Sequence, residues 1–271
     1  MPVVAPASPD LVSPDIDLEP ILARYRQDGY ARVGRVFEEE TLARLRARAE
    51  AMMRGEVAYP GLFFQHDTTT GRYEDLEYKK GYVGPSLNYR KIEKLEKDPL
   101  FFSLIEHPLF ERIARAWIEG PIVIYRAVLF NKSARAGTVL PWHQDGGSYW
   151  GLDRNPTLQI WTALDDAPEG GGCLEVIPGS HTAGLATPLG GVIPDACLAT
   201  RDIDEERVYL PARAGEVILV HNHLWHGSGV NGTDHPRRGV TVCYMTAETR
   251  CLRRKRAPRD FVRVFEGRAR A

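Results

Sequence analysis

Hydrophobic residues near the start of the chain recur with helical spacing. Apolar positions three or four residues apart predict amphipathic helices over residues 16–28, 39–53 and 98–117. A short apolar stretch at residues 30–33 lies between the first two and predicts a strand. These helices are expected to cover the outside of the fold.

From residue 121 onward the apolar runs become shorter and are bounded by turn residues. Such runs predict buried strands at residues 121–130, 216–220 and 239–245. Asn231-Gly232 predicts a turn between the last two of them. Several short strands after a helical start indicate a mainly β fold with flanking helices.

Three segments lack regular spacing. Residues 59–89 mix aromatic, glycine and charged residues, which favours a functional lid, with a packed surface loop as the alternative. Residues 182–204 predict a second loop, and residues 1–15 a mobile N-terminal segment rich in Pro and Ser. We expect residues 16–271 to form a single domain, because all-β barrels of this length often do.

His143 and Asp145 form the first candidate metal-binding pair. In an extended strand, residues two apart point to the same face, so both side chains can reach one ion. The pair alone is a weak signal, because His-x-Asp is common by chance. A second histidine would complete a set that leaves three adjacent coordination positions open, as non-haem Fe(II) chemistry requires. Zinc favours a closed tetrahedral site instead.

His226 and Arg237 are the candidates that complete this site. His226 follows the expected strand 216–220, and Arg237 begins the next one. An antiparallel pair joined in this way would place both residues on neighbouring strands facing one interior. The guanidinium could then hold a carboxylate in a two-point fork.

Four motifs follow one another along residues 20–250: His143-Gln-Asp145, Trp161 within residues 159–164, the glycine-rich run 170–181, and His226-Gly-Ser-Gly229 with Arg237 eleven residues after His226. In this order they resemble the phytanoyl-CoA dioxygenase family. The resemblance implies a double-stranded β-helix, a cupin-like jelly-roll, flanked by helices. Several spaced motifs in order are a far stronger signal than any one alone.

The resemblance also implies a role for each matching residue. Fe(II) would be held by three ligands, and the co-substrate 2-oxoglutarate would lie in the same pocket. The implied ligands are His143, Asp145 and His226, and the implied co-substrate residues are Arg237, Ser228, Trp161 and Lys91. The match of Lys91 rests on a single local pattern, Tyr89-Arg-Lys-Ile-Glu93.

The activity implied by the family uses O2 and 2-oxoglutarate to hydroxylate an unactivated C–H bond of a small metabolite, with release of succinate and CO2. Asp145 favours this outcome, since related halogenases carry a small residue in place of the carboxylate. Desaturation, epimerisation and ring closure stay open as alternatives. So do a non-catalytic jelly-roll that binds a ligand and a metal enzyme independent of 2-oxoglutarate.

Other residues compete for the same roles. His221 and His223 could form a metal pair of the cupin type, but such a pair normally has a Glu a few residues later, and residues 224–233 contain none. We therefore expect both histidines in the pocket wall or core. Arg238 competes with Arg237, and only one of two adjacent strand residues can face the interior.

Composition restricts the class of partner. The net charge of −1 argues against nucleic acid, because phosphate binding normally requires a basic surplus. The N-terminus does not resemble a secretory signal and no run is long enough for a membrane span, so we expect a cytoplasmic protein acting on a small molecule. The four cysteines are scattered and are expected to stay reduced.

The C-terminal segment 250–270 carries nine Lys or Arg residues. A solvated tail is one interpretation of such a charge run. The alternative is recognition of an anionic group on the substrate.

Overall fold

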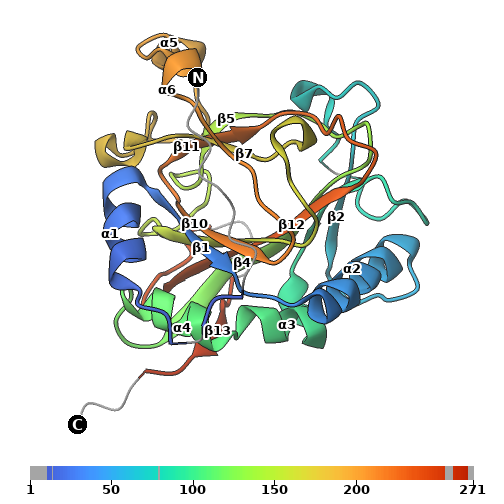
Figure 1. Cartoon of the computed structure of the whole chain (residues 1–271), viewed down its shortest axis with the longest axis horizontal. Coiled ribbons are helices and arrows are strands. Elements are labelled where there is room, and N and C mark those ends of the chain that lie inside the picture. The colour runs from blue at the N-terminus through green and yellow to red at the C-terminus, as the bar shows by residue number, and fades with distance from the viewer. Residues whose placement is uncertain (1–10, 14, 79, 254–258, 268–271) are drawn as a thin grey trace.

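Two antiparallel β-sheets form the core of the protein in a computed structural model that describes residues 11–13, 15–78, 80–253 and 259–267. Figure 1 shows the strands gathered at the centre, with helices outside them. The larger sheet contains, in spatial order, β1 (Tyr30–Arg35), β10 (Glu216–His221), β6 (Leu158–Ala163), β12 (Arg237–Thr246), β4 (Ile122–Lys132), β3 (Tyr89–Glu93) and β2 (Phe63–His66), and β13 (Val262–Phe265) also pairs with β4. The smaller sheet contains β8 (Gly191–Val192), β5 (Leu140–Gln144), β11 (Trp225–Ser228), β7 (Leu174–Ile177) and β9 (Val208–Leu210).

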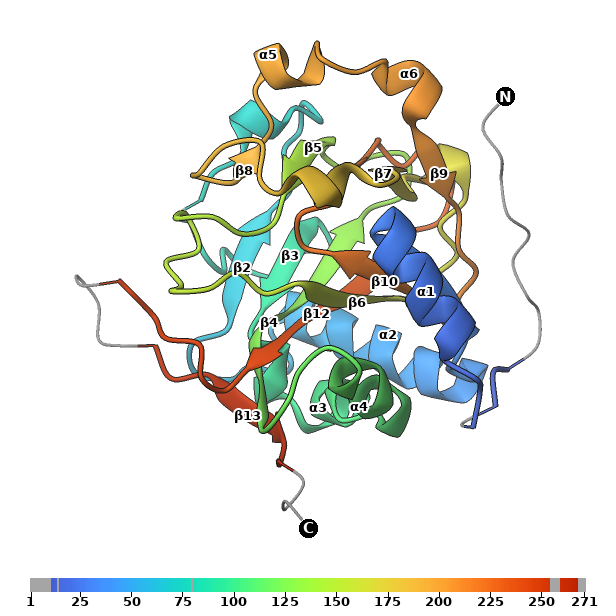
Figure 2. The same cartoon turned by 90° about the vertical axis from the view of Figure 1, so that its left-hand side faces the viewer.

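The helices cover two ends of this core. In Figure 2, α2, α3 and α4 lie along the larger sheet, and α5 and α6 lie at the opposite end, beyond the smaller sheet. The helices are α1 (Glu19–Asp28), α2 (Glu39–Arg54), α3 (Pro99–Ile105), α4 (Pro108–Arg115), α5 (Asp195–Leu198) and α6 (Ile203–Glu206). Four 3-10 turns accompany them: η1 (Tyr73–Asp75), η2 (Leu95–Lys97), η3 (Glu169–Gly171) and η4 (Ser180–Ala183). No helix in the described part of the chain is long and apolar enough to cross a bilayer.

Strand β12 shows why the larger sheet is apolar on one face and polar on the other. Val240, Val242 and Tyr244 pack into the core that also contains the helices. Arg237 and Thr241, at odd-numbered positions of the same strand, face the opposite way and line an internal cavity. Side chains alternate along a strand, so one segment supplies both the core and the cavity wall.

A β-bulge in β4 changes this alternation next to the cavity. Cys243 of β12 pairs with Arg126, but the next residue, Tyr244, pairs with Ile124, so Tyr125 is an extra residue. Ile124 and Leu129 both lie in the helix-covered core although their positions differ by an odd number. Bulges re-aim side chains in this way, and here the shift turns Arg126 toward the cavity.

The structure corrects three expectations about local structure. Residues 98–117 form α3 and α4 rather than one helix, because Pro108 cannot continue α3 and instead begins α4, where His107 Nδ1 accepts from Leu109 N–H at 3.2 Å. The segment 59–89 is not irregular throughout, since β2 pairs with β3. The expected loop 182–204 contains α5 and β8.

The two terminal segments lie partly outside the described residues. In the N-terminal segment 1–15, which was expected to be mobile, residues 1–10 and 14 lie outside the described residues. In the basic segment 250–270, residues 254–258 and 268–270 lie outside them as well.

Candidate metal centre

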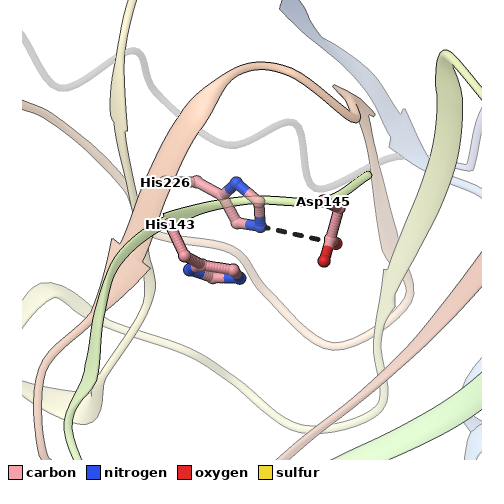
Figure 3. Close-up of side chains that lie close together, drawn as sticks. All are labelled: His143, Asp145 and His226. Carbon is pink, nitrogen blue, oxygen red and sulfur yellow. Dashed lines mark ion pairs between the residues drawn. The ribbon is translucent and has the colours of Figure 1, made fainter. Parts of the chain in front are cut away.

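Three potential metal ligands meet between the two strands β5 and β11. His143 of β5 and His226 of β11 are direct cross-strand partners, with ring centroids 4.0 Å apart. Asp145 follows the end of β5 and turns its carboxylate toward them, 3.8 Å from His226 Nε2 (Figure 3). One ligand atom from each residue lies within 4.8 Å of the others. The expected set of His143, Asp145 and His226 is therefore brought together.

Each histidine is oriented by a backbone carbonyl. His143 Nδ1 donates to Pro141 O at 2.9 Å, and His226 Nδ1 donates to Leu224 O at 2.8 Å. This fixes the tautomer and leaves the Nε2 lone pair of each ring free for a metal ion. Burial, followed by repulsion from His226, lowers the pKa of His143 to about 3, so the ring is neutral at physiological pH, as a ligand must be.

Asp145 is held in its charged form by the larger sheet. Arg126 Nη2 donates to both carboxylate oxygens at 3.1 Å, and Gln159 Nε2 donates to one of them at 2.8 Å. Burial alone would raise the pKa of Asp145, but Arg126 and the two histidines hold it well below its usual range. The carboxylate is therefore ionised and available to a cation.

Arg237 supplies an unsatisfied cation to the same cavity. Only 3% of this residue is exposed, and its Nε and Nη2 atoms have no hydrogen-bond partner. Burial lowers the pKa of Arg237 to about 10, yet the group stays charged at neutral pH. Its guanidinium lies 5.1 Å from the ring centre of Trp161. Buried, unpaired guanidinium N–H groups indicate a place for an anion that can accept from both.

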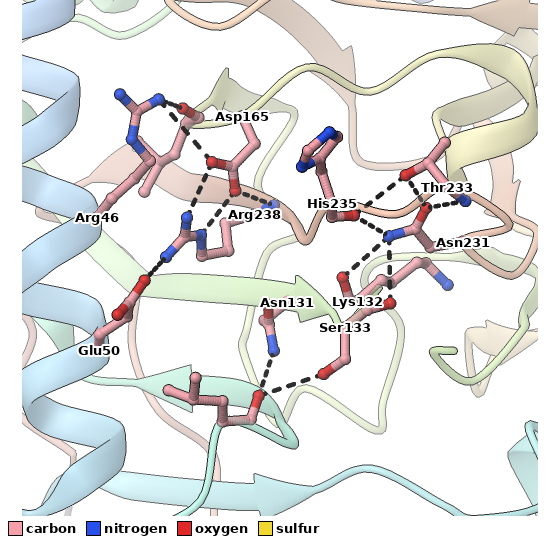
Figure 4. A network of polar contacts seen from close by, with 12 residues as sticks. Arg46, Glu50, Asn131, Lys132, Ser133, Asp165, Asn231, Thr233, His235 and Arg238 are labelled. Carbon is pink, nitrogen blue, oxygen red and sulfur yellow. Dashed lines mark hydrogen bonds and ion pairs between the residues drawn. The ribbon is translucent and has the colours of Figure 1, made fainter. Parts of the chain in front are cut away.

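The neighbouring Arg238 points the other way. Its guanidinium pairs with Asp165 at 2.6 Å and with Glu50 of α2 at 2.8 Å, as Figure 4 shows. The next residue, Gly239, lies against Trp161. A Cβ at this position would lie 2.6 Å from Trp161 Nε1, so a larger residue would collide with the ring. Of the two competing arginines, Arg237 is the one that lines the cavity.

The relationship expected between His226 and Arg237 is wrong. They were expected on neighbouring antiparallel strands, but β11 belongs to the smaller sheet and β12 to the larger. Both residues line the same cavity from opposite sheets, together with Ser228 and Trp161. The long connection between β11 and β12 therefore crosses between the sheets and is not a hairpin.

Lys91 does not line this cavity. Its ammonium pairs with Glu93 and lines a neighbouring cleft. His221 and His223 are also outside the cavity lining, and the backbone N–H of His223 donates to His221 Nδ1 at 3.0 Å. Among the described residues, neither of them belongs to a group of three or more possible metal ligands.

Several cavity residues were missed by sequence reasoning. Lys132 donates to Thr138 O at 2.6 Å, and burial, followed by repulsion from Arg237 and Arg90, lowers the pKa of Lys132 to about 7. A charged residue within an apolar strand is the signal that could have identified it. The same signal applies to Arg126, and a polar residue within an apolar strand applies to Gln159, whereas Arg90 lies in the mixed strand β3 and has no such signal.

The residues present fit both a divalent cation and a dicarboxylate. The cavity encloses about 60 Å³, and its described lining contains four Arg or Lys side chains but a single carboxylate, that of Asp145. Two imidazoles and one carboxylate with open positions suit Fe(II). The surplus of cations suits a dianion such as 2-oxoglutarate, with Arg237 placed to take a carboxylate.

Comparison with known proteins places the chain in a family. Residues 25–239 match the model for phytanoyl-CoA dioxygenase. Phytanoyl-CoA dioxygenase domain-containing protein 1 of Mus musculus is 30% identical over 158 residues, which cover 55% of this chain and 54% of that protein. The peroxisomal phytanoyl-CoA dioxygenase of the same species is 24% identical over 237 residues, 84% of this chain and 68% of that protein. The chain thus spans about half the length of the first relative.

Solved structures of low sequence identity share the fold. EctD from S. alaskensis in its apo form has a TM-score of 0.69 and 22% identity, over 94% of this chain and 88% of that chain. The epimerase SnoN in complex with Fe3+, alpha ketoglutarate and nogalamycin RO has a TM-score of 0.67 and 23% identity, over 89% of this chain and 88% of that chain. The expectation of a jelly-roll core with flanking helices is confirmed.

Proposed function

Because this chain belongs to the phytanoyl-CoA dioxygenase family of Fe(II)- and 2-oxoglutarate-dependent oxygenases, we propose that it hydroxylates an unactivated C–H bond of a small metabolite. Its cofactor is Fe(II), and 2-oxoglutarate and O2 are co-substrates. In the proposed reaction 2-oxoglutarate leaves as succinate and CO2. The near-neutral charge of the chain favours a small-molecule substrate over nucleic acid, and we place the reaction in the cytoplasm.

One observation carries this proposal. The ligand atoms of His143, Asp145 and His226 lie within 4.8 Å of one another, and the unpaired guanidinium of Arg237 lines the same buried cavity. A metal site alone does not need a buried, unpaired arginine, because such a group costs free energy unless an anion joins it. The combination favours a metal ion and a carboxylate co-substrate bound together.

In this proposal the metal ligands and the residues that contact them have separate roles. His143, Asp145 and His226 would hold Fe(II), with the His143 imidazole kept neutral by burial and the carboxylate kept charged by Arg126. When bound, Fe(II) and 2-oxoglutarate supply, with O2, an oxidant strong enough for a C–H bond.

The cavity wall positions the co-substrate. Arg237 would take its remote carboxylate in a two-point contact, and Trp161 packs against that guanidinium. Ser228 of β11 lines the same cavity and offers a hydroxyl. Phe130, Leu140 and Leu174 form apolar parts of the wall and would keep bulk water away from the reacting atoms.

Hydroxylation is distinguished from its alternatives by the product. Purified protein is incubated with Fe(II), 2-oxoglutarate, O2 and candidate substrates, and both succinate and the substrate-derived product are followed by mass spectrometry. We expect succinate and a product with one added oxygen atom in equal amounts. Loss of two hydrogens would indicate desaturation or ring closure, and an unchanged mass with a changed stereocentre would indicate epimerisation.

A further inference from the structure

A second cleft lies next to the metal centre and shares Arg126 with it. The first cavity encloses only about 60 Å³, whereas the second measures about 650 Å³ and is open to the outside. Arg126 lines both, and its guanidinium contacts Asp145. A molecule in the second cleft would therefore lie next to the Arg126–Asp145 pair, at the border of the metal centre.

Aromatic side chains form the walls of this cleft. Tyr125 and Trp150 are buried and stacked with ring centroids 4.2 Å apart. Tyr78 and Tyr149 also line the cleft and are 51% and 66% exposed. Exposed rings at the mouth of a cleft offer faces on which a flat ligand ring can stack.

The charge of the cleft is positive. Lys91 is paired with Glu93, the one acidic residue among the described lining, and Arg126 is paired with Asp145. Among the described residues, Arg253 and Arg259 form no ion pair of 4 Å or less with a carboxylate, although Glu93 and Glu96 are near enough for the charge of Arg259 to favour their ionised forms.

These two arginines are nevertheless held in place. Arg253 Nη2 donates to Tyr149 O at 3.0 Å, and Arg259 Nη2 donates to Tyr125 O at 2.5 Å. The Arg259 guanidinium also lies 4.7 Å from the ring centre of Tyr125. Positioned guanidinium groups without a carboxylate partner are suited to bind a carboxylate or a phosphate.

We propose that this cleft binds the molecule that is oxidised, and that this molecule carries a flat ring and an anionic group. The ring lies against Tyr78 and Tyr149, and the anionic group contacts Arg253 and Arg259. The inference rests on the proposed function and adds the chemical class of its substrate. The basic segment 250–270 thus contributes to recognition through these two arginines.

Binding of four probes to the protein loaded with Fe(II) and saturating 2-oxoglutarate, without O2, tests this proposal. Calorimetry is run with cinnamate, phenyl phosphate, the neutral cinnamamide and the non-planar cyclohexanepropanoate. Saturating 2-oxoglutarate keeps the anionic probes away from Arg237. We expect at least one aromatic anion to bind about tenfold more tightly than either the amide or the non-planar acid. Whichever of cinnamate and phenyl phosphate binds more tightly shows whether the anionic group of the substrate is a carboxylate or a phosphate ester.

Two variants assign the anion contact. Arg253→Gln and Arg259→Gln should each weaken binding of the preferred anion about tenfold, because each removes a charge-assisted contact. Arg263→Gln is the matched control, since Arg263 is exposed, pairs with Glu266 at 3.1 Å and does not line the cleft. Unchanged affinity in both variants, equal binding of cinnamamide, or no binding of either aromatic anion overturns the proposal.

The same samples separate this inference from the proposed function. The visible charge-transfer absorption of 2-oxoglutarate chelated to Fe(II) is recorded before each titration. If the wild-type protein lacks that absorption, the proposed function fails. If the absorption is present and the probes do not discriminate, only the substrate class is wrong.

Discussion

Arg126 Nη2 lies 3.1 Å from both carboxylate oxygens of Asp145, so a residue of the larger sheet holds the acidic ligand that follows β5 of the smaller sheet. The contact ties the metal centre to β4 at the point where the bulge turns Arg126 inward. Electrostatically, the guanidinium favours the charged form of Asp145 and disfavours the charged form of His143. Both effects keep Asp145 and His143 free of protons.

Arg126→Gln should therefore move the acid limit of metal binding to higher pH. Without the guanidinium, burial raises the pKa of Asp145 and the pKa of His143 rises as well, so protons compete with the metal at higher pH. We expect a shift of about one pH unit or more in the midpoint of anaerobic Fe(II) binding. Arg154→Gln is the control, because Arg154 is exposed and pairs with Glu248. A midpoint unchanged or lowered in Arg126→Gln would contradict this role.

Arg237→Ala should raise the KM for 2-oxoglutarate far more than Arg238→Ala does. Removing a buried charge partner of a carboxylate costs about 2–5 kcal/mol. Arg238→Ala instead removes the ion pairs with Asp165 and Glu50, which keep only their contacts with Arg46 at 3.9 Å and Arg54 at 3.2 Å, and it should lower the melting temperature. Steady-state kinetics and thermal unfolding of both variants make the comparison. Equal effects on KM would show that the wrong arginine has been assigned to the co-substrate.

The sequence predicted the centre of the site because its residues follow regular strand geometry. His143 and Asp145 are two positions apart on an extended stretch, and alternation alone places them on one side. Arg126 could not be found in this way. Counted from Ile122 without a bulge, it would face the helices, and only the long-range pairing of Cys243 and Tyr244 shows the shift.

The sheet assignment of His226 also depends on long-range pairing. A strand, a turn and a strand in sequence resemble a hairpin, yet β11 pairs with β5 and β7 while β12 pairs with β4 and β6. The periodicity of a segment does not determine which other strand it pairs with. The division of the expected helix 98–117, in contrast, could have been predicted from the sequence alone, because Pro108 cannot continue a helix that begins before it.

The affinity for 2-oxoglutarate should fall as the pH rises above about 7. Lys132 has a pKa of about 7 with the cavity free of an anion, so its ammonium is charged below that pH. A bound dicarboxylate raises this pKa, and binding above pH 7 must therefore take up a proton. Calorimetry in two buffers of different ionisation enthalpy measures the uptake. Lys132→Met should abolish it, and proton uptake that persists in this variant would exclude Lys132 as its source.

The segment between β2 and β3 should become protected when the site is filled. The β2–β3 ladder and the contact of Asp67 N–H with Asn88 O at 2.7 Å already hold its ends, whereas Tyr78 is exposed at the second cleft. We expect slower hydrogen exchange in peptides from residues 67–78 and 80–88 with Fe(II), 2-oxoglutarate and substrate present. Exchange in α4, which lines neither cavity, serves as the internal reference. Equal protection with and without ligands would make this segment a static loop.

His143→Ala, Asp145→Ala and His226→Ala should each abolish turnover of 2-oxoglutarate with little loss of stability. The three side chains line a cavity, and none of them belongs to the apolar core clusters. Succinate release with added Fe(II) measures turnover, and circular dichroism with thermal unfolding measures the fold. A wild-type rate in any one variant would remove that residue from the ligand set.

Anaerobic titration of the wild-type protein with Fe(II) and 2-oxoglutarate tests the central claim most directly. If His143, Asp145 and His226 hold iron while Arg237 holds the co-substrate beside it, a visible charge-transfer band must appear only when both are added. The band should be lost in His226→Ala and require more 2-oxoglutarate in Arg237→Ala. A wild-type protein that binds both components without developing the band would contradict the account.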